Sequence, residues 1–429
     1  MLDPALIRAE PARLKASLAR RGIGAEIVDR AADLDTRWCA RETAAQALRA
    51  RRRRIADEVA EGKHAGRDTS NLEQLGRQVA EELRGAEREL DELDAARRGA
   101  LLALPNLPAA DVPEETIVSS ESAARDRAPG GSGGPLPHWD LIKILGLAHT
   151  AEGSAGRGFL VWRGCGARLV RALVALLLDF HTREGGFEEV RCPAVATARA
   201  LEGSAHLPTL GDKMYNVVAS DLYLAPRAEP HLANLYAGKV IGAGALPVRL
   251  VASGPAFRRE AGAAGRDSRG LLRLHEFPTV EVYVFCRPEE SDAELERAVD
   301  SAAGALKRLN LRHRRLLRGA RQLSHAAAKT INLEVWAPGL GRWLQVAAVS
   351  SFTDYQARRT NTRFRDAGGK ARWVHTVGGA AVGVPHLLAA ILENGQRADG
   401  SVALPEALYP YMGGQETLRA GSPQPRTEA

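Results

Sequence analysis

Arginine, aromatic and carboxylate side chains are spaced by glycines in the segment 257–281, which reads FRREAGAAGRDSRGLLRLHEFPTVE. The glycines predict a loop, and the β-branched run at 277–284 predicts a strand, so the segment is expected to form a hairpin. Arginine forks match phosphate oxygens, an aromatic face stacks on a base, and carboxylates hold an amine or a metal ion. The segment therefore predicts a site for a planar ligand that carries phosphate. The residues expected to act there are Arg258, Glu260, Arg269, Phe277 and Glu281.

A surface hairpin whose charges pair with one another would also contain Phe-Arg-x-Glu, and this interpretation stays open for the short motif alone. The complete string is more specific, and it resembles motif 2 of the class II aminoacyl-tRNA synthetases in the form carried by seryl-tRNA synthetase. By this resemblance Arg258 contacts the α-phosphate of ATP and the carboxylate of the amino acid, with Glu260 adjacent to it. Phe277 stacks on adenine, Arg269 is a further loop arginine, and Glu281 belongs to the serine pocket. The implied cofactors are ATP and Mg²⁺.

Composition limits the elements that can position these residues. A chain of 429 residues is long enough for two or three domains, and a net charge of +7 is compatible with a polyanionic partner. The four cysteines are scattered without a CxxC pair, so neither zinc nor a disulfide framework is expected. No signal peptide is visible, and the most apolar segment, 169–180, is too short to span a membrane. A cytoplasmic protein without a membrane partner is therefore expected.

Two long amphipathic helices are predicted at about 27–62 and about 70–102, with a glycine-containing turn between them. Their narrow apolar seams and charged outer faces predict an antiparallel coiled coil. Such an arm can serve as a spacer or in dimerisation, and charged runs on helices are commonly solvated faces. The arm also resembles the N-terminal tRNA-binding arm of seryl-tRNA synthetase, which implies salt-dependent contacts with RNA phosphates. The basic residues expected to contact tRNA are Arg51, Arg52, Arg53, Arg54 and Lys63.

A polar segment rich in Ser, Gly and Pro at 119–137 predicts a linker. The resemblance resumes after it, and helix 166–184 with the following GFEEVRCP is similar to motif 1, which implies a homodimer. The implied fold class is α+β, with a class II synthetase-type antiparallel sheet flanked by helices and preceded by the helical arm. The predicted organisation is an arm at 1–115, a linker at 116–137, a catalytic domain at 138–414 and a disordered tail at 415–429.

The expected serine pocket departs from the family's pattern. The family has Thr-Ala-Glu in its serine-recognition loop, whereas this chain has Arg227-Ala228-Glu229. Arginine is larger than threonine, and it carries the same charge as the ammonium group of serine. We predict that Arg227 fills the pocket and pairs with Glu229, Glu260 or Glu281.

The nucleotide side departs as well. By resemblance, Gln345 replaces a metal-binding glutamate and Ala348 replaces its serine partner, which leaves Gln345 as a weak oxygen ligand for a metal. The motif 3 arginine expected at the γ-phosphate of ATP is His386, which lacks the forked donor of arginine. Loss of one charge-assisted contact of this kind is worth about 1.5–3 kcal/mol. The substitutions therefore predict weakened contacts to serine, metal and phosphate on an intact fold.

These features predict a seryl-tRNA synthetase-like protein whose aminoacylation is impaired or lost and whose binding of tRNA or another partner is retained. The alternative is an active ligase that charges tRNA with serine or an altered amino acid, including one that serves a biosynthetic pathway. Motif 2 is intact, and Arg227 could recognise a substrate anion. A third interpretation, transfer of an amino acid to a carrier protein, fits less well because proteins of that kind lack the arm.

Overall fold

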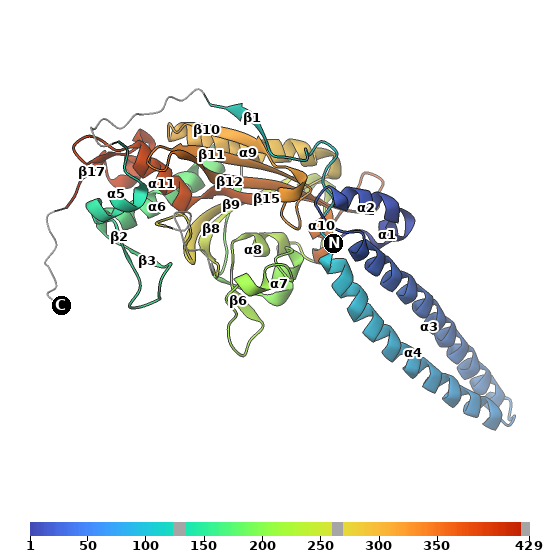
Figure 1. Cartoon of the computed structure of the whole chain (residues 1–429). Helices are drawn as coiled ribbons and strands as arrows, with labels where there is room; N and C mark the ends of the chain where they lie inside the picture. The colour runs from blue at the N-terminus through green and yellow to red at the C-terminus, as the bar shows by residue number, and fades with distance from the viewer. Residues whose placement is uncertain (123–133, 260–268, 422–429) are drawn as a thin grey trace. The chain divides into compact units, whose positions relative to one another are not determined.

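The computed structural model describes residues 1–122, 134–259 and 269–421, and the chain divides into two compact units, Met1–Leu107 and Pro108–Ala429 (Figure 1). The first unit is helical, and the second is an antiparallel sheet flanked by helices. The predicted α+β class is confirmed. Among the described helices, none combines the length and the apolar character that crossing a membrane requires.

The first unit is a long helical hairpin with two short helices at its base (Figure 1). Proline occupies the first turn of each short helix, where its missing N–H leaves no bond unmade. The hairpin closes on apolar side chains from both long helices, including Ala45, Ile55, Val79, Leu83 and Leu90. The predicted pair of long helices is confirmed, and each is slightly longer than expected. The helices are α1 Pro4–Ala9, α2 Pro11–Ala19, α3 Glu26–His64 and α4 Ser70–Ala103.

The second unit is built on an eight-stranded sheet in the order β1-β10-β11-β12-β15-β9-β8-β4. Neighbouring strands pair antiparallel except β4 and β8, which are parallel at one edge. The strands are β1 Ile117–Glu121, β4 Glu188–Arg191, β8 Val248–Phe257, β9 Glu276–Cys286, β10 His313–Leu317, β11 Lys329–Ala337, β12 Arg342–Thr353 and β15 His375–Gly383.

Helices cover one face of this sheet and bury the main hydrophobic core against it. The covering helices are α5 His138–Leu145, α6 Gly164–Arg183, α9 Ser291–Arg308 and α11 Val384–Asn394. Because side chains alternate along a strand, the opposite face is left for polar residues. Three short helices lie near that face: α7 Ala198–Gly203, α8 Glu229–Asn234 and α10 Tyr355–Thr360.

Small two- and three-stranded sheets complete the unit. Their strands are β2 Ala148–Thr150, β3 Leu160–Trp162, β5 Val195–Thr197, β6 Leu222–Leu224, β7 Val240–Ile241, β13 Arg363–Arg365, β14 Ala371–Trp373, β16 Val402–Ala403 and β17 Thr417–Leu418.

The structure differs from the predicted organisation at two places. Within the predicted linker 116–137, β1 is the edge strand of the main sheet and pairs with β10. All five of its residues are exposed, so it lacks the alternating pattern that identifies a strand, and backbone pairing alone holds it. Within the predicted tail 415–429, β17 pairs with β16. The remaining parts, 123–133 and 422–429, lie outside the described residues.

Candidate functional site

The candidate site lies on the sheet face opposite the core helices. Along β9, Val280 and Val282 point into the core, while Thr279 and Glu281 belong to the other face. A register shift between Leu333 and Glu334 of β11 changes the pairing with β12. Because alternate side chains of a strand point to opposite faces of the sheet, Thr279 and Glu281 lie on the face that the core helices do not cover.

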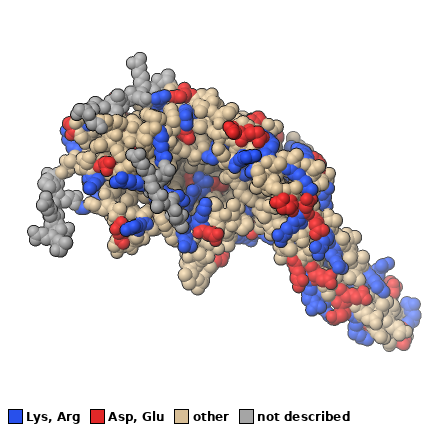
Figure 2. All heavy atoms as spheres, viewed as in Figure 1, with Lys and Arg blue, Asp and Glu red and all other residues tan. Residues whose placement is uncertain are grey.

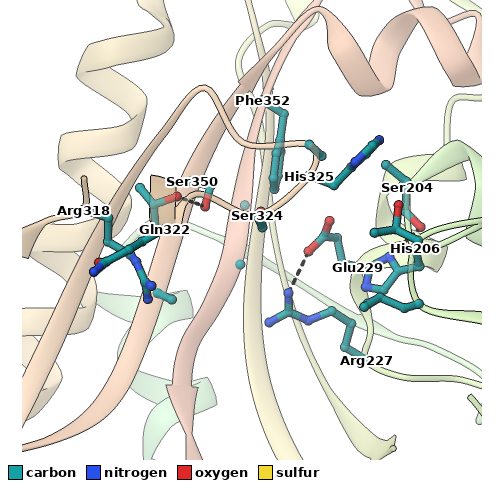
Figure 3. Close-up of a pocket in the computed structure, with 18 of the residues that line it drawn as sticks. Ser204, His206, Arg227, Glu229, Arg318, Gln322, Ser324, His325, Ser350 and Phe352 are labelled. Carbon is teal, nitrogen blue, oxygen red and sulfur yellow. Dashed lines mark hydrogen bonds and ion pairs between the residues drawn. The ribbon is translucent and has the colours of Figure 1, made fainter. Parts of the chain in front are cut away.

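A cavity of about 380 Å³ opens on this surface (Figure 3). Figure 3 shows Arg227, Glu229 and His206 at one side of it and Arg318 and Gln322 at the other. A second cavity of about 210 Å³ shares Arg227 with the first. The predicted residues that line one or both cavities are Arg227, Glu229, Arg258, Phe277, Gln345, Ala348 and His386.

Arg227 occupies the acidic side of the first cavity. Its Nε donates to Glu281 Oε1 at 3.1 Å, and its Nη1 donates to Glu229 Oε2 at 3.1 Å. Burial acts to lower the pKa of Arg227, but its attraction to the two carboxylates outweighs burial and raises it. The predicted pairing with Glu229 and Glu281 is confirmed, and Glu260 lies outside the described residues.

The two carboxylates have further partners that fix their orientation. The backbone N–H of Glu229 donates to Glu281 Oε2 at 2.9 Å, and Gln356 Nε2 donates to Glu229 Oε1 at 2.8 Å. Tyr283 in turn donates its hydroxyl to Gln356 Oε1 at 2.7 Å. Burial raises the pKa of Glu229, and the charge of Arg227 opposes that rise. A buried network of this kind holds a charge only while all its partners remain in place.

Gln345 is engaged on the nucleotide side. Its Oε1 accepts from Asn332 Nδ2 at 2.8 Å and from Arg318 Nη1 at 3.3 Å. Mg²⁺ prefers charged carboxylate oxygens, whereas here the available oxygen is a neutral amide beside a guanidinium. Ala348, which pairs with Asn332 in the β11–β12 ladder, offers no side-chain oxygen. The donor set at Gln345 and Ala348 therefore does not fit a magnesium ion.

His386, near the start of α11, connects two backbone segments. Its Nδ1 lies 2.7 Å from the carbonyl oxygen of Gln345, and its Nε2 lies 3.1 Å from that of Leu272. Both ring nitrogens are therefore occupied by protein acceptors, and a neutral imidazole can donate to only one of them. Neither nitrogen is left to bind a phosphate oxygen.

The two arginines that were predicted to contact the nucleotide, Arg258 and Arg269, differ in whether they line a cavity. The Arg258 guanidinium lies 5.9 Å from the ring centroid of Phe277, and both residues line the smaller cavity. Arg269 instead lies 5.1 Å from the ring centroid of Trp139 in α5, and it lines neither cavity. A guanidinium over an indole face is a favourable cation–π contact, which accounts for its placement.

Residues of the cavity and its hydrogen-bond network that the sequence did not point to include Arg318, Asn332 and Gln356. Gln356 lies in the stretch DYQARR at 354–359, and its contact with Glu229 depends on the docking of α10 against α8. Arg318 follows β10 in the run RRLLRGARQ, where several arginines give no sign of which one enters a cavity.

The helical hairpin carries both signs of charge, as Figure 2 shows. Arg51, Arg52, Arg53 and Arg54 are all exposed. Consecutive helical residues are about 100° apart, so these arginines cover most of the circumference of α3. Lys63, by contrast, pairs with Glu73 at 2.8 Å.

Comparisons with known proteins agree across the chain. Residues 1–108 match the model of the seryl-tRNA synthetase N-terminal domain, and residues 215–395 match that of the tRNA synthetase class II core domain (G, H, P, S and T). A serine--tRNA ligase of Gemmatimonas aurantiaca is 42% identical over 96% of this chain and 99% of its own length. One of Akkermansia muciniphila is 38% identical over 96% and 98%, respectively.

A solved structure gives the same result for the fold. The seryl-tRNA synthetase of Pyrococcus horikoshii, complexed with ATP, aligns with a TM-score of 0.87 at 32% identity. The alignment covers 98% of this chain and 100% of that one. Both the hairpin and the sheet unit therefore have counterparts in a single known protein.

Proposed function

The chain belongs to the seryl-tRNA synthetase family, and from this membership we propose that it binds tRNA while its activation of serine is impaired or lost. The observation that carries the proposal is the ion pairing of Arg227. In the family's pattern this position holds a small threonine, and the adjacent carboxylates serve the amino acid. Here Arg227 bonds both Glu229 and Glu281.

An incoming serine would have to displace this arginine. Its ammonium group would enter beside a cation, and it would compete for carboxylates that already have a charged partner. Removing one member of a buried ion pair costs about 3–5 kcal/mol when nothing replaces it. A single ammonium would recover part of this free energy but would leave the displaced guanidinium to be accommodated.

The nucleotide side supports the same conclusion. Gln345 offers a neutral amide where the family has a glutamate, and Arg318 lies beside it. His386 directs its two ring nitrogens at carbonyl oxygens and lacks the forked cation of arginine. We therefore propose that the family's Mg²⁺-dependent contacts to the triphosphate are weakened, while Arg258 and Phe277 keep a place for the nucleotide.

Binding of tRNA is proposed for the helical hairpin. Its domain family is that of the seryl-tRNA synthetase N-terminal domain, and the arginines at 51–54 are exposed. Phosphate contacts of this kind supply affinity with little base specificity. A homodimer and a cytoplasmic location are part of the same proposal, as expected for proteins of this family.

Serine-dependent exchange of pyrophosphate into ATP tests the catalytic part, and filter binding of serine tRNA tests the RNA part. The expected results are no exchange above background together with saturable, salt-sensitive tRNA binding. The Gemmatimonas aurantiaca ligase, assayed in parallel, is the positive control for reagents and tRNA. Exchange at a rate comparable to that control would refute the proposal.

An active ligase remains the second candidate, because a cavity of about 380 Å³ lies beside Arg227 and a relative with 42% identity is named a serine--tRNA ligase. Supplying the twenty amino acids one at a time in the exchange assay decides between the candidates. Activity with any of them would favour the ligase, and uniform silence would favour the first proposal.

A further inference from the structure

Arg318 is a cation without a carboxylate partner in the main cavity. Its backbone N–H donates to the carbonyl oxygen of Thr330 at 3.0 Å, which fixes its Cα directly after β10. Its side chain lines the cavity, and its Nη1 donates only to the neutral amide of Gln345. The nearby acid Glu334 pairs instead with Arg314 at 2.7 Å. Among the described residues, Arg318 forms no ion pair.

The Nε of Arg318 is buried and has no hydrogen-bond partner among the described residues. Oδ1 of Asn332, whose side chain also lines the cavity, is likewise buried and without a partner in that part of the chain. Buried polar groups are normally satisfied, so one donor on a cation and one acceptor on an amide identify what a ligand would supply. The Nε of Arg318 would be satisfied by an oxyanion of a ligand, and Oδ1 of Asn332 would be satisfied by a hydroxyl or amide hydrogen of the same ligand.

The lining of the cavity that contains Arg318 carries more positive than negative charge, although the acid Glu334, which is outside the lining, also acts on Arg318. Of the described residues that line the cavity, three are arginines and one, Glu229, is an acid. Arg227 bonds both Glu229 and Glu281. Even when Glu281 is counted with Glu229, the three arginines outnumber the two acids. Burial, together with the charges of Arg227 and Arg258, holds the pKa of His206 well below its usual range.

The guanidinium fork accepts carboxylate or phosphate oxygens through parallel N–H bonds, and a buried Nε beside a free cavity suits that geometry. An ammonium group would find both carboxylates on the acidic side of the cavity already paired with Arg227. We propose that the cavity binds a small hydroxycarboxylate, or its phosphate monoester, with the oxyanion on Arg318 and no requirement for an ammonium group. This rests on the proposed function in one respect, namely that Arg227 excludes serine from the same cavity.

Three probes separate the elements of this proposal, each measured by calorimetric titration of the full chain without ATP or tRNA. L-Glycerate has the same configuration as L-serine and differs from it only in carrying a hydroxyl in place of the ammonium group. 3-Phosphoglycerate adds a phosphate, and L-serine is the comparator. We expect glycerate or phosphoglycerate to bind at millimolar concentration or below and serine not to bind. Preference for one of the two anions identifies a carboxylate or a phosphate as the group on Arg318.

The matched variants are Arg318→Gln and Arg321→Gln. Arg321 lies three residues further along the same loop, is exposed and lines neither cavity. Removing a charge-assisted contact should weaken anion binding about tenfold or more in Arg318→Gln and leave it unchanged in Arg321→Gln. Serine binding as tight as that of the anions, equal anion affinity in both variants, or no binding of any probe would each overturn the proposal.

A crystal structure of the unmutated chain with 3-phosphoglycerate provides a second test if Arg318→Gln does not fold. An oxyanion within hydrogen-bonding distance of Arg318 Nε would support the proposal, and a ligand bound elsewhere would contradict it. Serine-dependent pyrophosphate exchange would refute the proposed loss of serine activation and would leave the oxyanion contact to these measurements. The two proposals therefore fail on different results.

Discussion

Replacing Arg227 with threonine should destabilise the second unit and open its cavity to cations. The change removes both charge-assisted bonds and the guanidinium that pairs with Glu229 and Glu281, which are 4% and 0% exposed. Breaking a buried pair in this way costs about 3–5 kcal/mol. For a unit of this size, that corresponds to a fall of roughly 5–10 °C in the melting midpoint.

Protonation of a carboxylate limits this loss, and the sign of the pH dependence follows. Burial already raises the pKa of Glu229, and without Arg227 that pKa should rise further. The folded variant then binds more protons than the unfolded chain, so its stability falls as the pH rises. The difference in melting midpoint between Arg227→Thr and the unmodified protein should therefore be larger at pH 8 than at pH 5.5.

Differential scanning calorimetry at both pH values measures this difference, with and without serine. Arg315→Thr is the matched control, because Arg315 also contacts two acids, Glu296 and Asp300, which are 46% and 72% exposed. Exposed pairs contribute about 0–1 kcal/mol, so the control should unfold nearly as the unmodified protein does. Serine should stabilise only Arg227→Thr. An Arg227 variant that matches the control at both pH values and gains no response to serine would refute the ion-pair reasoning.

Three further predictions concern other parts of the chain. In Gln345→Glu, the new carboxylate should pair with Arg318 instead of restoring a metal site. The Mg²⁺-dependent affinity for ATP, measured by calorimetry, should therefore stay within about threefold of the original. A larger gain in affinity would show that the carboxylate reaches the metal. Changing the arginines at 51–54 to glutamine should lower the affinity for tRNA, measured by filter binding. The slope of log affinity against log salt concentration should become shallower by up to about 3, because fewer phosphates are neutralised. An unchanged slope would show that the RNA binds elsewhere. Burial lowers the pKa of His181 to about 4, so the unfolded chain takes up its proton first and stability is lost as the pH falls from about 6.5 towards 4, by roughly 3 kcal/mol. His181→Gln should flatten this part of the melting curve against pH, and an unaltered profile would assign the loss to other groups.

The sequence was sufficient for the features that depend on local pattern. Apolar spacing in α3 and α4 predicted the hairpin, because a helical seam repeats every few residues whatever it packs against. The expected hairpin at 257–281 predicted that Arg258 and Phe277 would lie close together, because a hairpin brings its two arms side by side. The exposed strand β1 was missed, because its pairing with β10 connects segments almost two hundred residues apart and leaves no periodic pattern.

The resemblance to the family's serine pocket also predicted that Arg227 would meet carboxylates, because a buried arginine needs them. Only the tertiary structure decided which partners each charged group has. Glu334 and Gln345 are adjacent in the ladder, yet Glu334 pairs with Arg314 and Arg318 meets only the amide of Gln345. Which partner each group has depends on the strand register and on the turn after β10. These set the distances between segments that are far apart in the sequence. The sequence determined the kinds of charge in the cavity, and the fold determined which one was left without a partner.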